Sequence, residues 1–328
     1  MKRASDQAEE KLTISAGNKK LAATLLIFIS LLIFTAFVPF IAQGKENSSN
    51  FKALTLEEKQ FLYNLRQERW EANSRQILQK IAGFRGEAGI MVKDLQTGWT
   101  FLHNEDQLFP AASLIKIPIM VACFKAAREG LIRLDEKYVL NRKDRVGGSG
   151  ILRRMRNGRT FTYEELINFM VTHSDNIATN VLIDRLGFDY INRVFAERGL
   201  KTTRLRRKMI DFAARENGLE NYTTAEEITR VLEMIYRERC YSREISKKCL
   251  EVLKQQQIND RLPRFLPKDT QVAHKTGLEK EVCHDAGIVF TPYGDYVITI
   301  LVRTWTGPKT TKAFIARLSS YFYQVFKT

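Results

Sequence analysis

Short apolar runs of the kind that form β-strands lie near both ends of the region that follows residue 55. They are residues 88–92, 99–102, 272–276, 286–290 and 296–302. Turn-like residues separate the first two runs, and this arrangement predicts a β-hairpin. The sequence therefore predicts a sheet to which both ends of this region contribute.

Apolar residues at helical spacing fill most of the remaining positions. A capping box at Thr55 begins a helical pattern that runs to about Ile81, and the last helix is expected to begin near Pro308. Residues 129–257 are helical and rich in loops, and residues 201–221 are expected to form a long structured loop. These elements predict an α+β fold, in which an antiparallel sheet is flanked by the N- and C-terminal helices and an all-α lobe is inserted. A functional site is expected in the cleft between the two parts.

The segment 21–42 is apolar and carries no charge, and it is long enough to cross a bilayer as a helix. Lys19 and Lys20 precede it and fewer positive charges follow, so the positive-inside rule keeps the N-terminus in the cytoplasm and exports the remainder. A cleaved signal peptide is the alternative, but its apolar core is usually shorter, and no small-x-small site stands out near Ala42.

Four parts follow from this pattern. They are a cytoplasmic tail (1–20), a transmembrane anchor (21–43), a linker (44–55) and a folded domain (56–328), whose α/β part comprises 56–128 and 262–328 and whose helical lobe comprises 129–261. We expect the folded domain on the extracytoplasmic side of the cell membrane.

The formal net charge of the 328-residue chain is +15. Such a charge favours anionic surroundings, such as a membrane surface, an acidic wall polymer or nucleic acid. The basic residues are scattered, except in the clusters 153–156 and 204–208, and no zinc-finger spacing or other nucleic-acid-binding motif is present. We therefore expect no nucleic-acid partner. His103, His173 and His284 lack metal-ligand spacing and are expected to be structural, so we expect no metal. We also expect no other cofactor and a monomeric protein.

The chain contains four cysteines, Cys123, Cys240, Cys249 and Cys283. Export would permit disulfides, and Cys240 and Cys249 are close enough in sequence to pair. Spacing alone does not establish connectivity, so buried free thiols remain the alternative.

Ser113 and Lys116 stand three residues apart at the predicted start of a helix, among apolar residues. Positions i and i+3 share a helix face, so this spacing directs the Lys116 amine toward the Ser113 hydroxyl. A buried amine that has lost its proton can act as a base and make a serine nucleophilic. The same spacing also arises from an N-cap serine followed by a surface lysine, so this motif alone does not establish a catalytic pair.

Two further polar motifs stand where they could line the cleft. Ser174-Asp175-Asn176 separates two predicted helices, and His274-Lys275-Thr276-Gly277 ends a predicted strand. The three motifs, in this order, resemble the signature set of class A β-lactamases and penicillin-binding proteins, and the resemblance covers residues 59–328. It implies a membrane-anchored serine hydrolase that forms an acyl-enzyme with β-lactams, D-alanyl-D-alanine peptides or both.

The resemblance also implies a role for each matching residue. Ser113 is the nucleophile, Lys116 accepts its proton, and Ser174 relays that proton to the leaving nitrogen. Lys275 is expected to lower the pKa of Lys116 by like-charge repulsion. The remaining expected roles are substrate-amide binding by Asn176, carboxylate binding by Lys275, Thr276 and Gly277, and an oxyanion hole from the backbone N–H groups of Ser113 and Leu278. Asp175 and His274 are expected to be structural.

Three positions depart from the family pattern. Class A β-lactamases carry a glutamate in a motif close to Arg-Leu-x-Arg-x-Glu-x-x-Leu-Asn. Here Met209 stands in place of the glutamate, and Phe212-Ala213 replaces Leu-Asn. That glutamate activates the water that hydrolyses the acyl-enzyme, so we expect slow deacylation. Asp211 is a candidate replacement base, and a salt bridge with Arg206 or Arg207 is its alternative role. A D-alanyl-D-alanine carboxypeptidase with poor β-lactam turnover, and a non-hydrolysing receptor for β-lactams or wall fragments, are the alternative functions.

Overall fold

The computed structural model describes residues 55–327. The predicted tail and anchor, and the linker up to residue 54, lie outside this range. The chain divides into two compact units, Met1–Gln67 and Glu68–Thr328, and the boundary falls within helix α3 (Leu56–Ala82). In the described part of the first unit, Thr55 forms the predicted capping box with Glu58, with the two reciprocal bonds at 2.8 and 3.2 Å. Across residues 55–327, no helix is long and apolar enough to span a membrane.

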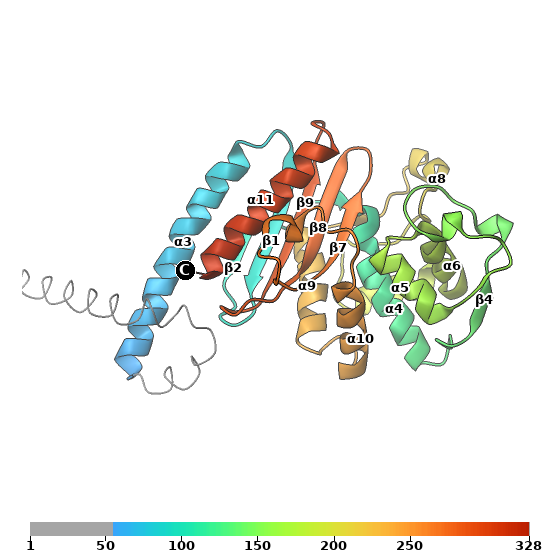
Figure 1. Cartoon of the computed structure of the whole chain (residues 1–328), viewed down its shortest axis with the longest axis horizontal. Coiled ribbons are helices and arrows are strands. Elements are labelled where there is room, and N and C mark those ends of the chain that lie inside the picture. The colour runs from blue at the N-terminus through green and yellow to red at the C-terminus, as the bar shows by residue number, and fades with distance from the viewer. Residues whose placement is uncertain (1–54, 328) are drawn as a thin grey trace, which may run out of the picture. The chain divides into compact units, whose positions relative to one another are not determined.

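A five-stranded antiparallel sheet organises the second unit (Figure 1). In spatial order its strands are β2 (Thr100–His103), β1 (Glu87–Asp94), β9 (Tyr296–Arg303), β8 (Val282–Val289) and β7 (Val272–Leu278). Strand β1 pairs with both β2 and β9, so segments from the two ends of the domain meet inside one sheet. The predicted antiparallel sheet is confirmed.

Strand β8 begins at Val282, four residues earlier than the sequence predicts. The added residues include His284 and Asp285, which interrupt the apolar pattern although both are buried in the sheet. The Asp285 carboxylate contacts Nδ1 of His274 at 2.9 Å and accepts from the backbone N–H of Leu262 at 3.0 Å. Buried polar groups with such partners are tolerated in a strand interior.

Helices cover both faces of the sheet. The part of helix α3 that belongs to the second unit (68–82) and helix α11 (Pro308–Lys327) lie against one face, where Ile81, Ile298 and Phe322 belong to a single apolar core (Figure 1). On the other face, helix α9 (Ala225–Tyr236) contacts β9, helix α10 (Arg243–Lys254) contacts β7, and Val297 and Leu301 join a second core. Alternate side chains of β9 thus pack into the two cores on opposite faces of the sheet, as strand geometry requires.

The inserted lobe is mainly helical. It contains α5 (Tyr163–Thr172), α6 (Asn176–Leu186), α7 (Phe188–Glu197) and α8 (Phe212–Glu216). Helix α4 (Lys116–Arg128), which falls within the predicted α/β part, packs against α5, α6 and α7. The expectation of an all-α lobe is wrong in detail. Short strands also occur, and they pair as β4 (Lys137–Val139) with β5 (Thr160–Thr162) and β3 (Phe109–Pro110) with β6 (Tyr222–Thr223). Strands of two or three residues are too short to leave an alternating pattern.

All four cysteines are buried free thiols, so the Cys240–Cys249 disulfide is not formed. Burial raises the pKa of Cys240 to about 11. The thiol of Cys240 therefore stays protonated at neutral pH and is a poor nucleophile.

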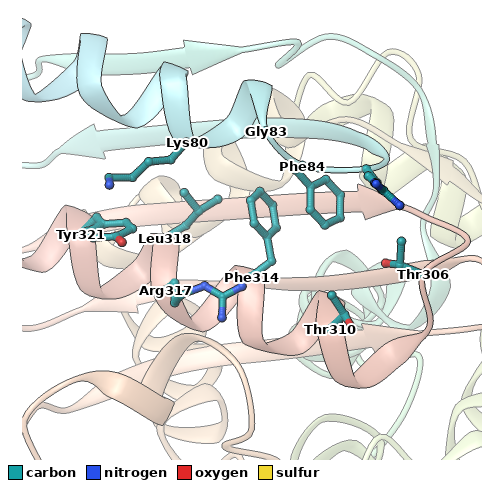
Figure 2. Close-up of a pocket in the computed structure, with 10 residues that line it drawn as sticks. Lys80, Gly83, Phe84, Thr306, Thr310, Phe314, Arg317, Leu318 and Tyr321 are labelled. Atoms are coloured by element: carbon teal, nitrogen blue, oxygen red, sulfur yellow. The ribbon is translucent and has the colours of Figure 1, made fainter.

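A groove of about 340 Å³ lies between α3 and α11 (Figure 2). The rings of Phe84 and Phe314 stack at a centroid distance of 4.0 Å in its wall, and Lys80 lies over the ring of Tyr321. None of the predicted catalytic residues lines this groove.

Candidate active site

Ser113 lies in a 3₁₀ turn (Ala112–Ile115) that leads directly into α4, which begins at Lys116. Side chains at i and i+3 eclipse in such a turn, so Ser113 and Lys116 share one side. Ser113 is partly exposed, whereas Leu114, Ile115 and Lys116 are fully buried. Ala112 has a φ of +43°, a conformation that is strained for a residue with a Cβ. The turn therefore presents the Ser113 side chain from an otherwise buried segment.

A buried histidine holds the segment before this turn. Nδ1 of His284 accepts a hydrogen bond from the N–H of Val302 at 3.0 Å, so Nε2 carries the proton that it donates to the Pro110 carbonyl at 2.8 Å. Burial lowers the pKa of His284 to about 4. The neutral imidazole thus ties strand β9 to the chain just ahead of Ser113, in agreement with the expected structural role.

The structure brings together the polar side chains of the three motifs. Nζ of Lys116 lies 2.7 Å from the Ser174 carbonyl oxygen, 3.3 Å from its Oγ and 2.8 Å from Oδ1 of Asn176. Nζ of Lys275 lies 3.0 Å from the same Ser174 Oγ and 2.8 Å from the Thr276 carbonyl oxygen. One hydroxyl group therefore connects two fully buried amines.

Burial controls the charge of these two amines. Desolvation lowers the pKa of Lys116 to about 7, against the opposing fields of Asp175 and Glu279. Desolvation also holds the pKa of Lys275 well below its usual range, and repulsion from Lys116 lowers it further. The expected cause of the Lys116 shift needs correction, because its main cause is burial and the like-charge effect falls on Lys275.

The recorded hydrogen bonds of the Lys116 amine go to residues other than Ser113. Within residues 55–327, its hydrogen bonds go to Ser174 and Asn176, and none joins Nζ to the Ser113 hydroxyl. Asn176 holds this arrangement, because its Nδ2 donates to the Gly147 carbonyl at 3.2 Å and leaves Oδ1 for Lys116. The amide that was expected to bind substrate therefore also positions the proposed base.

Asp175 is the N-cap of α6 and is fully buried. Its carboxylate accepts hydrogen bonds from the backbone N–H groups of Ala178, at 2.9 Å, and Leu152, at 2.8 Å. Ser174 has a φ of +54° just before this cap. The expected structural role of Asp175 agrees with these contacts, since the cap fixes the strained residue whose hydroxyl lies between the amines.

Strand β7 runs along the other side of the Ser113 turn. A Cβ on Gly277 would lie 3.4 Å from the Cβ of Ala112, so the strand passes directly against the turn. The N–H of Glu279 donates to the Val282 carbonyl at 3.0 Å, toward β8. Alternate residues of a strand point their backbone groups to opposite edges, so the N–H of Leu278 faces away from β8. Since β7 is the edge strand, this N–H is free to serve as the predicted oxyanion donor.

Met209 is buried at the position where the family pattern has glutamate. Asn180 holds its backbone through two bonds, one from Met209 N to Oδ1 at 2.8 Å and one from Nδ2 to the Met209 carbonyl at 3.1 Å. Asn180 and Asn176 are four residues apart on α6, a spacing that could have indicated a shared face. The side chain at position 209 supplies no acid or base.

Asp211 caps helix α8, where Oδ1 accepts from the N–H of Ala214 at 3.0 Å. The salt bridge with Arg206 or Arg207 that was the alternative role of Asp211 is absent from the described structure. Arg207 instead pairs with acidic residues that the sequence did not single out. No contact described in residues 55–327 joins Asp211 to Ser113.

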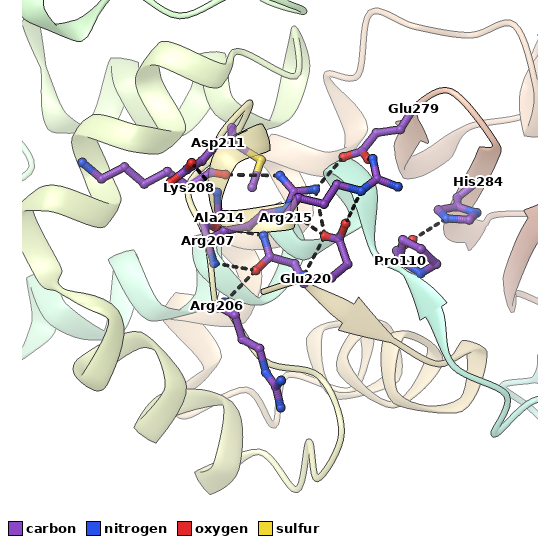
Figure 3. A network of polar contacts seen from close by, with 12 residues as sticks. Pro110, Arg206, Arg207, Lys208, Asp211, Ala214, Arg215, Glu220, Glu279 and His284 are labelled. Carbon is purple, nitrogen blue, oxygen red and sulfur yellow. Dashed lines mark hydrogen bonds and ion pairs between the residues drawn. The ribbon is translucent and has the colours of Figure 1, made fainter. Parts of the chain in front are cut away.

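Four side chains of alternating charge form a closed ring of ion pairs (Figure 3). They are Arg207, Glu220, Arg215 and Glu279. Nη2 of Arg207 lies 2.8 Å from Oε1 of Glu220 and 3.2 Å from Oε1 of Glu279. Arg215 completes the ring with Oε2 of Glu220 at 3.1 Å and Oε2 of Glu279 at 3.2 Å. The ring joins the loop 201–221 to the end of β7. Glu279 had no signal in the sequence, because only the fold brings it to this loop.

Comparisons with known proteins agree with this geometry. The model of the Beta-lactamase enzyme family matches residues 72–326. A beta-lactamase of Rhodobacter capsulatus is 32% identical over 141 residues, which are 42% of this chain and 47% of that protein. The structure of a beta-lactamase from Sphaerobacter thermophilus has a TM-score of 0.72 and 30% identity, and covers 78% of this chain and 97% of its own. A mutant of PBP-A, solved as an acyl-enzyme complex with penicillin G, has a TM-score of 0.72 and 31% identity over 78% and 97% of the two chains.

These matches confirm the predicted resemblance and the prediction of a serine hydrolase, and they show that the chain belongs to the beta-lactamase enzyme family.

Proposed function

We propose that this protein is a membrane-anchored enzyme that forms an acyl-enzyme on Ser113 with β-lactams. The observation that carries this proposal is the Ser174 hydroxyl, which lies within hydrogen-bond distance of both Lys116 and Lys275. That geometry offers a proton path between two buried amines, of which Lys116 is the base. PBP-A, the neighbour solved with penicillin G, supports β-lactams as the substrate class.

Acylation needs one proton to move from Ser113 to the leaving nitrogen. Neutral Lys116 takes the proton as the Ser113 oxygen bonds to the lactam carbonyl carbon, and the backbone N–H groups of Ser113 and Leu278 stabilise the oxyanion. The C–N bond then breaks, and the proton passes from Lys116 through the Ser174 hydroxyl to nitrogen. Lys275 and Thr276 bind the substrate carboxylate.

Deacylation is the slow half of the cycle. A water must attack the acyl ester, and the buried thioether of Met209 gives it no base. Lys116 has to serve again, although its amine is already held by Ser174 and Asn176. We therefore expect the acyl-enzyme to accumulate with β-lactams.

The same observation at Met209 favours a second candidate, a D-alanyl-D-alanine carboxypeptidase with poor β-lactam turnover. Its peptide substrate carries the same amide and carboxylate groups. A receptor that is acylated without turnover is the third candidate. The apolar segment 21–42 supports anchoring in the membrane, with the catalytic domain on the extracytoplasmic side.

Turnover measurements separate these functions. The full chain in non-ionic detergent is mixed with a chromogenic cephalosporin, or with an acyl-D-alanyl-D-alanine peptide, and Ser113→Ala is the control. Slow cephalosporin turnover with a stoichiometric burst supports the first proposal, and peptide cleavage supports the carboxypeptidase. Rapid steady cephalosporin turnover contradicts the role given to Met209, and activity that survives Ser113→Ala contradicts the whole assignment.

A further inference from the structure

The segment 137–159, which we call the basic loop, carries an unusual concentration of charge. It contains eight basic residues and one acidic residue, a net charge of +7 out of +15 for the whole chain. The mechanism above uses none of these charges. Seven of the eight basic residues are exposed, namely Lys137, Arg142, Lys143, Arg153, Arg154, Arg156 and Arg159. Within the described residues, none of these seven cations forms an ion pair with a carboxylate.

The basic loop is held in one conformation by its own arginine. Arg145 donates to the carbonyl oxygens of Leu152 and Met155, at 2.8 and 2.7 Å, and to Oδ1 of Asn157 at 2.9 Å. Asp144 is used locally, because its carboxylate accepts from the N–H of Asn141 at 2.7 Å. The single acid of the loop thus caps a turn. Within residues 55–327, the exposed cations therefore have no paired carboxylate, and they stand on a loop with a defined backbone.

The same loop packs against the Ser174-Asp175-Asn176 motif. The N–H of Asn176 donates to the Ser149 carbonyl at 3.1 Å, and Nδ2 of Asn176 donates to the Gly147 carbonyl at 3.2 Å. A Cβ on Gly150 would lie 2.3 Å from the Asp175 carboxylate, so the loop backbone is pressed against this motif. The N–H of Leu152, the neighbour of Arg153, also donates to the Asp175 carboxylate at 2.8 Å. The backbone of the basic loop therefore contacts the residue that is proposed to hold the substrate's amide, and the exposed cations flank these contacts in the sequence.

We propose that the basic loop is an extended substrate-binding rim that takes an acidic peptide on the acyl side of the reacting bond. Asn176 binds the amide of the acyl half, so the substrate continues from that amide toward the loop. A chain with several free carboxylates, as on an acidic wall peptide, matches unpaired arginines. A small β-lactam ends before it reaches them. This inference rests on the proposed function and names the substrate class for which the rim is suited.

The test uses two peptides that differ only in charge. Both end in D-alanyl-D-alanine; one carries two glutamates on the acyl side and the other carries two glutamines. Binding of each fluorescent peptide to the full chain in non-ionic detergent is followed by anisotropy. Exposed ion pairs are individually weak and screened by salt, so two to three of them predict about tenfold tighter binding of the acidic peptide at low salt.

The decisive variant is R153Q/R154Q/R156Q, and the matched control removes three exposed cations elsewhere, R239Q/K268Q/K309Q. We expect the first variant to lose the tenfold preference and the control to keep it. Acylation by penicillin should stay within about twofold of wild type in both, because the small substrate does not reach the loop.

The outcomes separate this inference from the proposed function. Equal binding of the two peptides by wild type, or an equal loss of preference in both variants, overturns the inference whether or not penicillin reacts. Tighter binding of a single-stranded oligonucleotide of matched charge overturns it as well, because the loop would then select charge alone. A retained preference for the acidic peptide in a protein that penicillin does not acylate supports the rim and refutes the proposed catalysis.

Discussion

Nζ of Lys116 lies 2.7 Å from the carbonyl oxygen of Ser174 and 3.3 Å from its hydroxyl oxygen. A residue with a positive φ thus directs both of its oxygens at one buried amine. Strain of this kind persists only where the surrounding structure enforces it. Here the neighbouring Asp175 cap provides that support, and it fixes the hydroxyl between Lys116 and Lys275.

The pH dependence of acylation should report the charge of Lys116. Burial lowers its pKa to about 7, so the amine is protonated and inactive below that pH and is a free base above it. We predict that the second-order rate constant for acylation by penicillin rises with pH, with a midpoint near 7. Stopped-flow labelling between pH 5 and 9 measures it. A flat profile across this range would exclude Lys116 as the base.

Replacing Met209 by glutamate should restore a deacylation base. Asn180 fixes the backbone of Met209 from both its N–H and its carbonyl, so the new carboxylate would start from a defined position. A positioned general base contributes at least about 10²-fold, and we predict an increase of this order in cephalosporin turnover by Met209→Glu. Met209→Gln, which has the same shape without the base, is the control. Equal turnover in the two variants would refute the account of slow deacylation.

Arg207 should contribute strongly to stability. Its side chain is 2% exposed and pairs with Glu220 and Glu279, so Arg207→Gln leaves buried negative charge without its main partner. Breaking a buried pair on one side typically costs about 3–5 kcal/mol. Denaturant unfolding of Arg207→Gln measures this loss. Arg133→Gln removes a pair whose members are 75% and 73% exposed, and it should leave the transition unchanged. Equal effects would show that the ring is energetically neutral.

The candidate site residues could be predicted from the sequence better than the contacts that surround them. Ser113, Lys116, Ser174 and Lys275 could be found because each lies in a short motif with fixed spacing. The contacts of Lys116 could not, because Ser174 is 58 residues away and the direction of the amine depends on tertiary packing. The same reason hid the His284 imidazole, whose partner Pro110 is 174 residues distant.

Glu227 shows how a local pattern misleads in detail. Thr224 and Glu227 have the spacing of a capping box, but only one of its two bonds is recorded, in which Thr224 Oγ1 accepts from the N–H of Glu227 at 3.1 Å. The carboxylate of Glu227 turns instead to the loop 201–221, where it accepts from the N–H groups of Lys201, Thr202 and Thr203 at 2.6, 2.9 and 2.7 Å. The Glu227 carboxylate therefore binds three backbone N–H groups of a distant loop in place of the nearby N–H of Thr224.

The stability contributed by Glu227 should depend on pH. Burial opposes ionisation, but the hydrogen bonds from Thr203 and Thr202 lower the pKa of Glu227 below 4.5. A carboxyl whose pKa falls on folding stabilises the fold above its unfolded pKa and loses that effect as the pH falls through the folded pKa. We predict that Glu227→Gln lowers the free energy of unfolding at pH 7, and that its difference from wild type shrinks below pH 4.5. A difference that stays constant with pH would contradict the role of the ionised carboxylate.

The most direct test of the central claim is the intact mass of the full chain after brief exposure to penicillin. Acyl transfer to Ser113 predicts that the mass rises by one whole penicillin molecule, since the ring opens without loss of atoms. The adduct should map to the peptide that contains Ser113 and should decay slowly. Ser113→Ala should show no adduct. An unmodified wild-type protein, or an adduct on another residue, would contradict the account.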